Sequence, residues 1–196
     1  MRAVTRDEIP SLEAYERARD AERARMIEVR RRRRVALGDL VSLGFENRQT
    51  VIYQVCEMMR AERMVEAHRI DEELAVYNDL LPAPGQLSST LFIEVPDQSQ
   101  IRTVLNRLVG VDEHVSLVVG DHVVPGESEP GRSMLEKTAS VHYVRWTLPE
   151  EARRQMRAGD VPVAFVCDHP NYAVRAVLDA AQVRELVGDL EADSAS

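Results

Sequence analysis

The hydrophobic period of the chain changes from 3.6 residues to 2 at Pro82–Gly85, and this constrains the fold more than any other feature. Before this segment, residues 46–81 contain neither glycine nor proline and repeat apolar residues at helical spacing. After it, short apolar runs alternate with polar residues between turn-forming residues, which is typical of strands. We therefore expect α+β architecture with a helical N-terminal region over 1–82, an α+β domain over 86–190 and a disordered tail over 191–196.

Two long helical segments are predicted in the N-terminal region. The first covers residues 11–36 and presents only a thin apolar stripe, and Gly38 and Gly44 bracket a connector after it. The second, 46–81, would be about 54 Å long if unbroken. Its apolar face carries charged residues in the middle. Either the helix breaks near residues 63–67 into a hairpin, or a polar site is set into a helix interface.

The remaining chain predicts a mixed, largely antiparallel sheet of about six strands with flanking helices. Gly120-Asp121 has the chemistry of a two-residue hairpin turn. Pro149 begins a helix that Gly159 ends. Strands are expected over 90–95, 114–119, 122–124, 138–148, 161–167 and 172–178, helices over 98–109, 149–159 and 180–190, and a loop or lid over 125–137.

Charge and composition restrict the function classes. The formal net charge of −8 disfavours non-specific binding to nucleic acid or to an anionic membrane. Arginines 30–34 point all the way round a helix, so they favour a solvated or acid-paired helix over a nucleic-acid-binding face. Two distant cysteines, no apolar stretch long enough to span a membrane and no signal-peptide pattern predict a cytoplasmic protein with free thiols.

Two histidines are the strongest candidates for chemistry. His142 lies on the apolar side of a long strand, and His169 is expected in a loop that follows another strand, next to Asp168. Two imidazoles and a carboxylate suit iron, manganese or zinc, so we consider a metal site at which these three residues converge. The alternatives are a core histidine bonded to a backbone carbonyl and local turn chemistry at Asp168.

Two glutamates extend the metal hypothesis. Glu62 and Glu66 lie one helical turn apart and could approach the histidines if the long helix packs across the sheet. Inward carboxylates of this kind form half of a di-iron bundle site, but the chain contains no Glu-x-x-His motif to complete it. An ion pair with Arg63 or Arg69 is the favoured alternative.

Four segments together resemble one known family. They are FENRQTVIYQVCEMMRAER, EELAVYNDLLPAPGQLSSTLFIE, KTASVHYVRW and DHPNY, in this order between about residues 40 and 190. The chain resembles the bacterial family catalogued as domain of unknown function 3501. The resemblance implies that the gene often lies beside genes for a rubrerythrin-like protein and an iron–sulfur oxidoreductase. It assigns no catalytic residues to this sequence. The matched motif positions are Glu46, Asn47, Arg48, Tyr77, Asn78, His142, Tyr143, Asp168, His169 and Tyr172.

Three functional hypotheses follow. The first is an accessory or metal-binding protein of an oxidative-stress or redox system, which acts with a redox partner protein. The second is a small metal-dependent enzyme with a His/Asp site, and the third is a nucleic-acid-binding or regulatory module that uses the arginine-rich helix. We also expect a homodimer through the N-terminal helices. The candidate pocket comprises Glu46, Arg48, His142, Tyr143, Arg145, Asp168, His169 and Tyr172.

Overall fold

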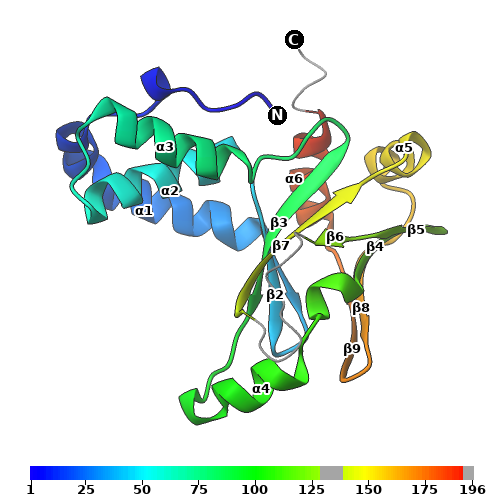
Figure 1. Ribbon diagram of the computed structural model, residues 1–196. Coiled ribbons are helices and arrows are strands. Elements are labelled where there is room, and N and C mark those ends of the chain that lie inside the picture. The colour runs from blue at the N-terminus through cyan, green and yellow to red at the C-terminus, as the bar shows by residue number, and fades with distance from the viewer. Residues whose placement is uncertain (129–138, 192–196) are drawn as a thin grey trace.

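The computed structural model describes residues 1–128 and 139–191, and its architecture is α+β, as the sequence predicts (Figure 1). No helix in these two ranges is both long and apolar enough to span a membrane. The elements in chain order are η1 (Arg6–Glu8), α1 (Leu12–Arg32), β1 (Arg34–Leu37), β2 (Val41–Phe45), α2 (Arg48–Ala61), α3 (Ala67–Asn78), β3 (Gln86–Ile93), η2 (Gln98–Gln100), α4 (Ile101–Arg107), η3 (Val111–His114), β4 (Val115–Val119), β5 (His122–Pro125), β6 (Glu127–Ser128), β7 (Val141–Thr147), α5 (Glu150–Ala158), β8 (Val163–His169), β9 (Tyr172–Val177) and α6 (Ala180–Glu191).

The strands form two antiparallel sheets rather than one mixed sheet. The five-stranded sheet has the order β1-β2-β3-β7-β6, and the four-stranded sheet has the order β5-β4-β8-β9. Their inward faces share one core, in which the Phe165 ring lies 5.3 Å from that of Phe45 and 5.0 Å from that of Trp146. The indole N–H of Trp146 donates to the Val115 carbonyl at 3.2 Å, so its polar atom is satisfied inside this core.

The predicted connector after the first helix is instead a β-hairpin, which corrects the sequence interpretation. Helix α1 ends at Arg32, and β1 pairs antiparallel with β2. In β1, Val35 and Leu37 are buried while the alternate residues are exposed, a period of 2 that the arginine run obscures. Gly38 makes the turn with φ +76°, a conformation that favours glycine. The N-terminal region is therefore not wholly helical, because this hairpin extends the sheet that contains β3 and β7.

The long glycine-free segment is a helical hairpin, one of the two alternatives that the sequence left open. Helix α2 ends at Ala61 and α3 begins at Ala67. Between them Arg63 has φ 51°, the left-handed conformation that ends a helix. Helices α2 and α3 pack on each other in a second apolar cluster, and α2 also packs on α1. Figure 1 shows all three helices grouped beside the five-stranded sheet.

The C-terminal elements follow the prediction with smaller differences. The β4–β5 hairpin, α5 and the β8–β9 hairpin all form. The helix expected over 98–109 is shorter, and Ile101 is exposed because the segment begins as a 3-10 turn. Strand β8 extends through His169, so this histidine is in a strand and not in the loop. Of the loop or lid expected over 125–137, residues 129–137 lie outside the described residues, and the described part includes the end of β5 and the short strand β6. Residue 138 of the expected strand and the tail over 192–196 also lie outside the described residues.

Candidate functional site

A row of cross-strand neighbours crosses the face of the five-stranded sheet that points away from the inter-sheet core. Arg34 on β1 pairs with Gly44 on β2, Gly44 pairs with Thr90 on β3, and Thr90 pairs with Tyr143 on β7. Direct neighbours of this kind place their side chains on the same face. Gly44 has no side chain, and the Phe92 ring lies close to it, since a Cβ added there would approach that ring to 3.3 Å.

Glu46 directly follows β2, contacts Thr90 of this row and is only 7% exposed. Its carboxylate accepts hydrogen bonds from the Thr50 hydroxyl at 2.5 Å, the Thr90 hydroxyl at 2.6 Å and the Gln54 amide at 3.1 Å. A carboxylate offers about four lone-pair sites. Three donors from the described residues therefore hold the group in place and leave an acceptor position for a further donor.

A pocket of about 360 Å³ surrounds Glu46, between the N-terminal helices and the sheet face. We call it the Glu46 pocket. Its volume lies at the lower end of the range for small-molecule sites. Eight of its twelve lining residues are polar or charged, so it suits a polar ligand. It is lined by Arg30, Arg33, Arg34, Gly44, Phe45, Glu46, Thr50, Gln54, Thr90, Phe92, Val141 and Tyr143.

Three arginines of the α1–β1 junction contribute to the pocket in different ways. Arg33 is 2% exposed and forms an ion pair with Asp189 of α6. Its guanidinium also donates to the backbone carbonyls of Phe45 and Glu46. Burial raises the pKa of Asp189, although the Arg33 guanidinium opposes that rise. The guanidinium of Arg34 lies over the Phe92 ring, 5.6 Å from its centroid. The guanidinium of Arg30 lies over the Tyr53 ring of α2, 5.0 Å from its centroid.

The other arginines of α1 mostly face acids, as the acid-paired interpretation predicts. Arg17, Arg25 and Arg31 pair with glutamates on α1 itself. Arg19 forms a two-bond pair with Glu57 of α2 at 2.8 and 2.9 Å, and this pair lowers the pKa of Glu57 to about 2. These pairs fix the helix layer in place rather than leaving an array of free cations.

His142 is a core histidine. It is 1% exposed and lies on the same side of β7 as Val144 and Trp146, as predicted. Its Nε2–H donates to the Ala139 carbonyl at 2.7 Å, and its Nδ1 lies 3.4 Å from an Asp112 carboxylate oxygen. This is the carbonyl-bonded arrangement that the sequence left open as the alternative to a metal ligand.

His169 and Asp168 belong to a separate group on the four-stranded sheet. The Nε2–H of His169 donates to the Val109 carbonyl at 3.1 Å, and its Nδ1 accepts from the Asn171 backbone N–H at 3.2 Å. A carboxylate oxygen of Asp168 lies 3.1 Å from His114 Nδ1. The imidazole rings of His114 and His169 pack edge to face, with their centroids 5.2 Å apart. Both nitrogens of His169 thus have protein partners.

The five residues of the metal hypothesis are not brought together. Glu62 pairs with Arg69 at 2.8 Å, which is the predicted alternative, and Glu66 is exposed at the start of α3. Across residues 1–128 and 139–191, no group of three or more His, Cys, Asp or Glu is arranged to hold a metal ion. The residues present there do not fit an iron, manganese or zinc centre.

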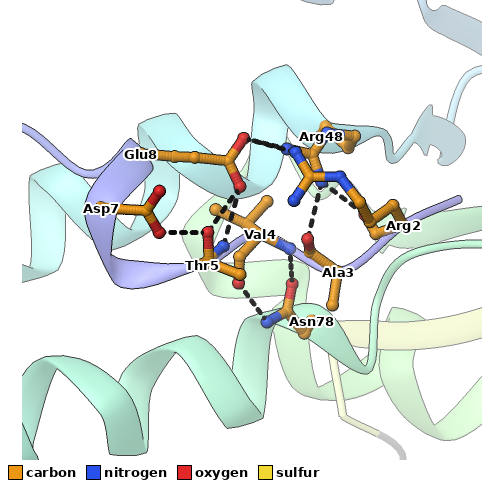
Figure 2. A network of polar contacts seen from close by, with 8 residues as sticks. All are labelled: Arg2, Ala3, Val4, Thr5, Asp7, Glu8, Arg48 and Asn78. Carbon is orange, nitrogen blue, oxygen red and sulfur yellow. Dashed lines mark hydrogen bonds and ion pairs between the residues drawn. The ribbon is translucent and has the colours of Figure 1, made fainter.

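Two further motif residues hold the N-terminal segment, as Figure 2 shows. The Asn78 side chain accepts from the Val4 N–H at 2.8 Å and donates to the Val4 carbonyl at 2.9 Å. Arg48 donates to the Ala3 carbonyl at 2.8 Å and pairs with Glu8. Hydrogen bonds from the Thr5 backbone N–H and from the Arg48 guanidinium lower the pKa of Glu8 to about 2. Arg48 therefore has a structural partner set and does not line the Glu46 pocket.

The remaining members of the predicted pocket are divided between two places. Tyr143 and Glu46 both line the Glu46 pocket. Arg145 donates to the Asp79 carbonyl instead. The Tyr172 hydroxyl accepts from the Leu40 N–H at 3.0 Å and donates to the Leu37 carbonyl at 2.7 Å, which ties β9 to the β1–β2 turn.

Sequence reasoning missed most of the pocket lining. Arg30, Arg33 and Arg34 were treated as one charged helix, and the threonines and Phe92 were not considered. A usable signal was present in the TLFIE segment. Alternation in this strand places Thr90 and Phe92 on one face and the apolar core residues on the other.

Comparison with known proteins identifies relatives without an assigned activity. The family model described as "Protein of unknown function (DUF3501)" matches residues 3–190. A crystal structure of a novel protein of unknown function from Burkholderia pseudomallei K96243 superposes with a TM-score of 0.90 at 36% sequence identity, covering 96% of this chain and 100% of that chain. A search of curated proteins finds no match.

Proposed function

Since the chain belongs to the DUF3501 family, which is described only as of unknown function, we propose a function from its own residues: it binds a small polar molecule in the Glu46 pocket. The observation that carries the proposal is the buried carboxylate of Glu46, which lines a cavity and is oriented by three protein donors. A buried carboxylate costs free energy unless it is compensated, so its position beside an open volume favours a ligand that donates to it.

Ligand-induced thermal stabilisation tests this function. A ligand at 100 times its Kd stabilises the folded state by about 2.7 kcal/mol. For a chain of this size that corresponds to a rise in Tm of roughly 5–10 °C. The panel consists of alkylamines, carboxylates, inorganic phosphate and amino acids at millimolar concentration, each measured by scanning fluorimetry.

The matched variants are Glu46→Gln and Glu62→Gln. Glutamine keeps the shape of Glu46 but removes its charge, so the ligand-induced shift should fall at least threefold while the shift of the Glu62→Gln control is unchanged. The comparison uses the shift and not the absolute Tm, because Glu46→Gln also alters bonds to Thr50 and Thr90. No shift with any compound class, or an undiminished shift in Glu46→Gln, would overturn the proposal.

An accessory role in an oxidative-stress system is a separate proposal whose only support is the family resemblance. Burial raises the pKa of the Cys56 thiol to about 12 and also raises that of Cys167, so neither residue favours the reactive thiolate. Elemental analysis of untagged protein purified without chelator tests the metal component. Less than about 0.1 equivalent of iron, manganese or zinc per chain would refute it.

A further inference from the structure

Apart from Arg33, which forms an ion pair with Asp189, the charged groups that line the Glu46 pocket lie at different positions along strand β3. The carboxylate of Glu46 lies at Thr90, whose hydroxyl it accepts at 2.6 Å. The guanidinium of Arg34 lies over Phe92, two residues further along the same face of the strand. Thr90 and Phe92 are separated by about 6.8 Å, since a strand rises about 3.4 Å per residue. An anionic acceptor and a cationic donor group therefore line one cavity at positions two residues apart along β3, which we call its anionic end and its cationic end.

Arg30 adds to the cationic end. It lines the pocket from the last turns of α1, and its guanidinium stacks on the Tyr53 ring at 5.0 Å from the centroid. Arg34 already pairs with Glu94, but no acidic side chain of the described residues forms an ion pair with Arg30. The two arginines and Glu94 leave a net positive charge at this end, which favours a ligand carboxylate or phosphate.

This arrangement selects against ligands of a single charge. An anion that reaches the arginines also meets Glu46, and an amine that reaches Glu46 leaves the cationic end without a partner. Complementary potentials raise specificity because juxtaposed like charges cost free energy. A molecule with a cationic group and an anionic group satisfies both ends of the pocket.

The spacing limits the size of that molecule. For two protein charges roughly 7–10 Å apart, two charge-assisted contacts of about 2.8 Å leave roughly 1.4–4.4 Å between the ligand's own charged atoms. The N–Cα–C unit of an α-amino acid spans this gap. Phe92 and Val141 supply apolar surface beside it, against which a side chain can pack.

We propose that the ligand of the Glu46 pocket is a free α-amino acid, with its ammonium group at Glu46 and its carboxylate at Arg30 and Arg34. The inference rests on the proposed function and specifies its ligand class. The Thr50, Gln54 and Thr90 donors orient Glu46 for the ammonium group, and the cavity between the two ends accommodates the Cα region.

Calorimetric titration with the twenty standard L-amino acids tests the proposal. The best binder is then compared with two analogues, the amine that lacks its carboxylate and the acid that lacks its ammonium group. Each analogue should bind at least tenfold more weakly, which is about 1.4 kcal/mol. An analogue that binds as tightly as the amino acid would show that the pocket does not read both charges.

Variants assign the two charges to the two ends. Glu46→Gln should weaken the amino acid at least tenfold and leave the affinity for the deaminated acid unchanged or higher. Arg34→Met, alone and combined with Arg30→Met, should weaken the amino acid and leave the amine unaffected. The control is Arg31→Met, which removes an exposed arginine paired with Glu28 outside the pocket.

The outcomes separate this inference from the proposed function. If amines or simple anions bind and no amino acid does, the amino-acid assignment is wrong while the binding function stands. If amino acids, amines, carboxylates and phosphate all fail to bind, both are wrong. Amino-acid binding that Glu46→Gln does not weaken would place the site elsewhere and refute the inference.

Discussion

Replacing Arg33 by methionine tests how the pocket is held in place. Arg33 is 2% exposed, and its partner Asp189 on α6 is 8% exposed. The same guanidinium donates to the Phe45 carbonyl at 3.0 Å and to the Glu46 carbonyl at 3.3 Å. One side chain thus joins the last helix to the backbone that carries the pocket carboxylate.

The expected cost follows from what the substitution leaves behind. Removing one partner of a buried ion pair costs about 3–5 kcal/mol, and a buried carbonyl that loses its donor adds about 1 kcal/mol or more. We expect Arg33→Met to lower the free energy of unfolding by about 4–6 kcal/mol. Arg32→Met is the control, because its pair with Glu185 is half exposed, and it should cost less than about 1 kcal/mol.

Urea unfolding monitored by tryptophan fluorescence measures both variants, since Trp146 is the single tryptophan and is buried. Asp189 adds a pH signature. Without Arg33 its raised pKa should rise further, and an acid with a raised folded-state pKa destabilises the protein above its unfolded pKa. The penalty in Arg33→Met should therefore shrink as the pH falls below the folded-state pKa. A loss below 1 kcal/mol, or a penalty that grows towards acid pH, would refute this reasoning.

Three further predictions concern the framework around the pocket. Tyr172→Phe removes the hydroxyl shared by Leu37 and Leu40 and should cost about 1–2 kcal/mol in urea unfolding, and an unchanged midpoint would contradict this. Arg19 lowers the pKa of Glu57 to about 2, so the contribution of this pair to stability is present above about pH 4.5 and is lost towards pH 2. Glu57→Gln should therefore flatten the dependence of the free energy of unfolding on pH in this range. An unchanged slope between pH 4.5 and pH 2 would contradict this prediction. The homodimer through the N-terminal helices remains a proposal, and light scattering that gives a monomer mass at micromolar concentration would refute it.

Periodicity alone predicts the parts of the fold whose residues contact neighbours in the sequence. The turn at Gly120-Asp121 follows from local conformational preferences, whereas the charged interruption of the apolar stripe left the break between α2 and α3 as one of two alternatives. The β1–β2 hairpin was missed because five consecutive arginines continue a helical charge pattern, whereas the deciding interactions of Arg33 are with Phe45 and Asp189. A contact between residues 156 positions apart has no local signature.

The candidate site divides in the same way. Glu46 and Tyr143, which line the pocket, lie in distinctive sequence motifs. The prediction that His142 and His169 share a site with them required the strands of both histidines to belong to one sheet. The two histidines lie on different sheets, and each has protein partners of its own. Strand register decides which side chains meet, and register depends on pairing order, which alternation within one strand does not determine.

The segment Glu46-Asn47-Arg48 shows how three adjacent motif residues can serve three different purposes. Asn47 caps α2, since its side chain accepts from the Thr50 N–H at 3.1 Å, and this fixes the backbone at the entry to the helix. On one side of the cap, Glu46 reaches into the pocket and bonds the hydroxyl of the same Thr50. On the other side, Arg48 reaches out to the N-terminal segment. The first turn of α2 therefore carries both a contact with the N-terminal segment, through Arg48, and a contact with the pocket carboxylate, through Thr50.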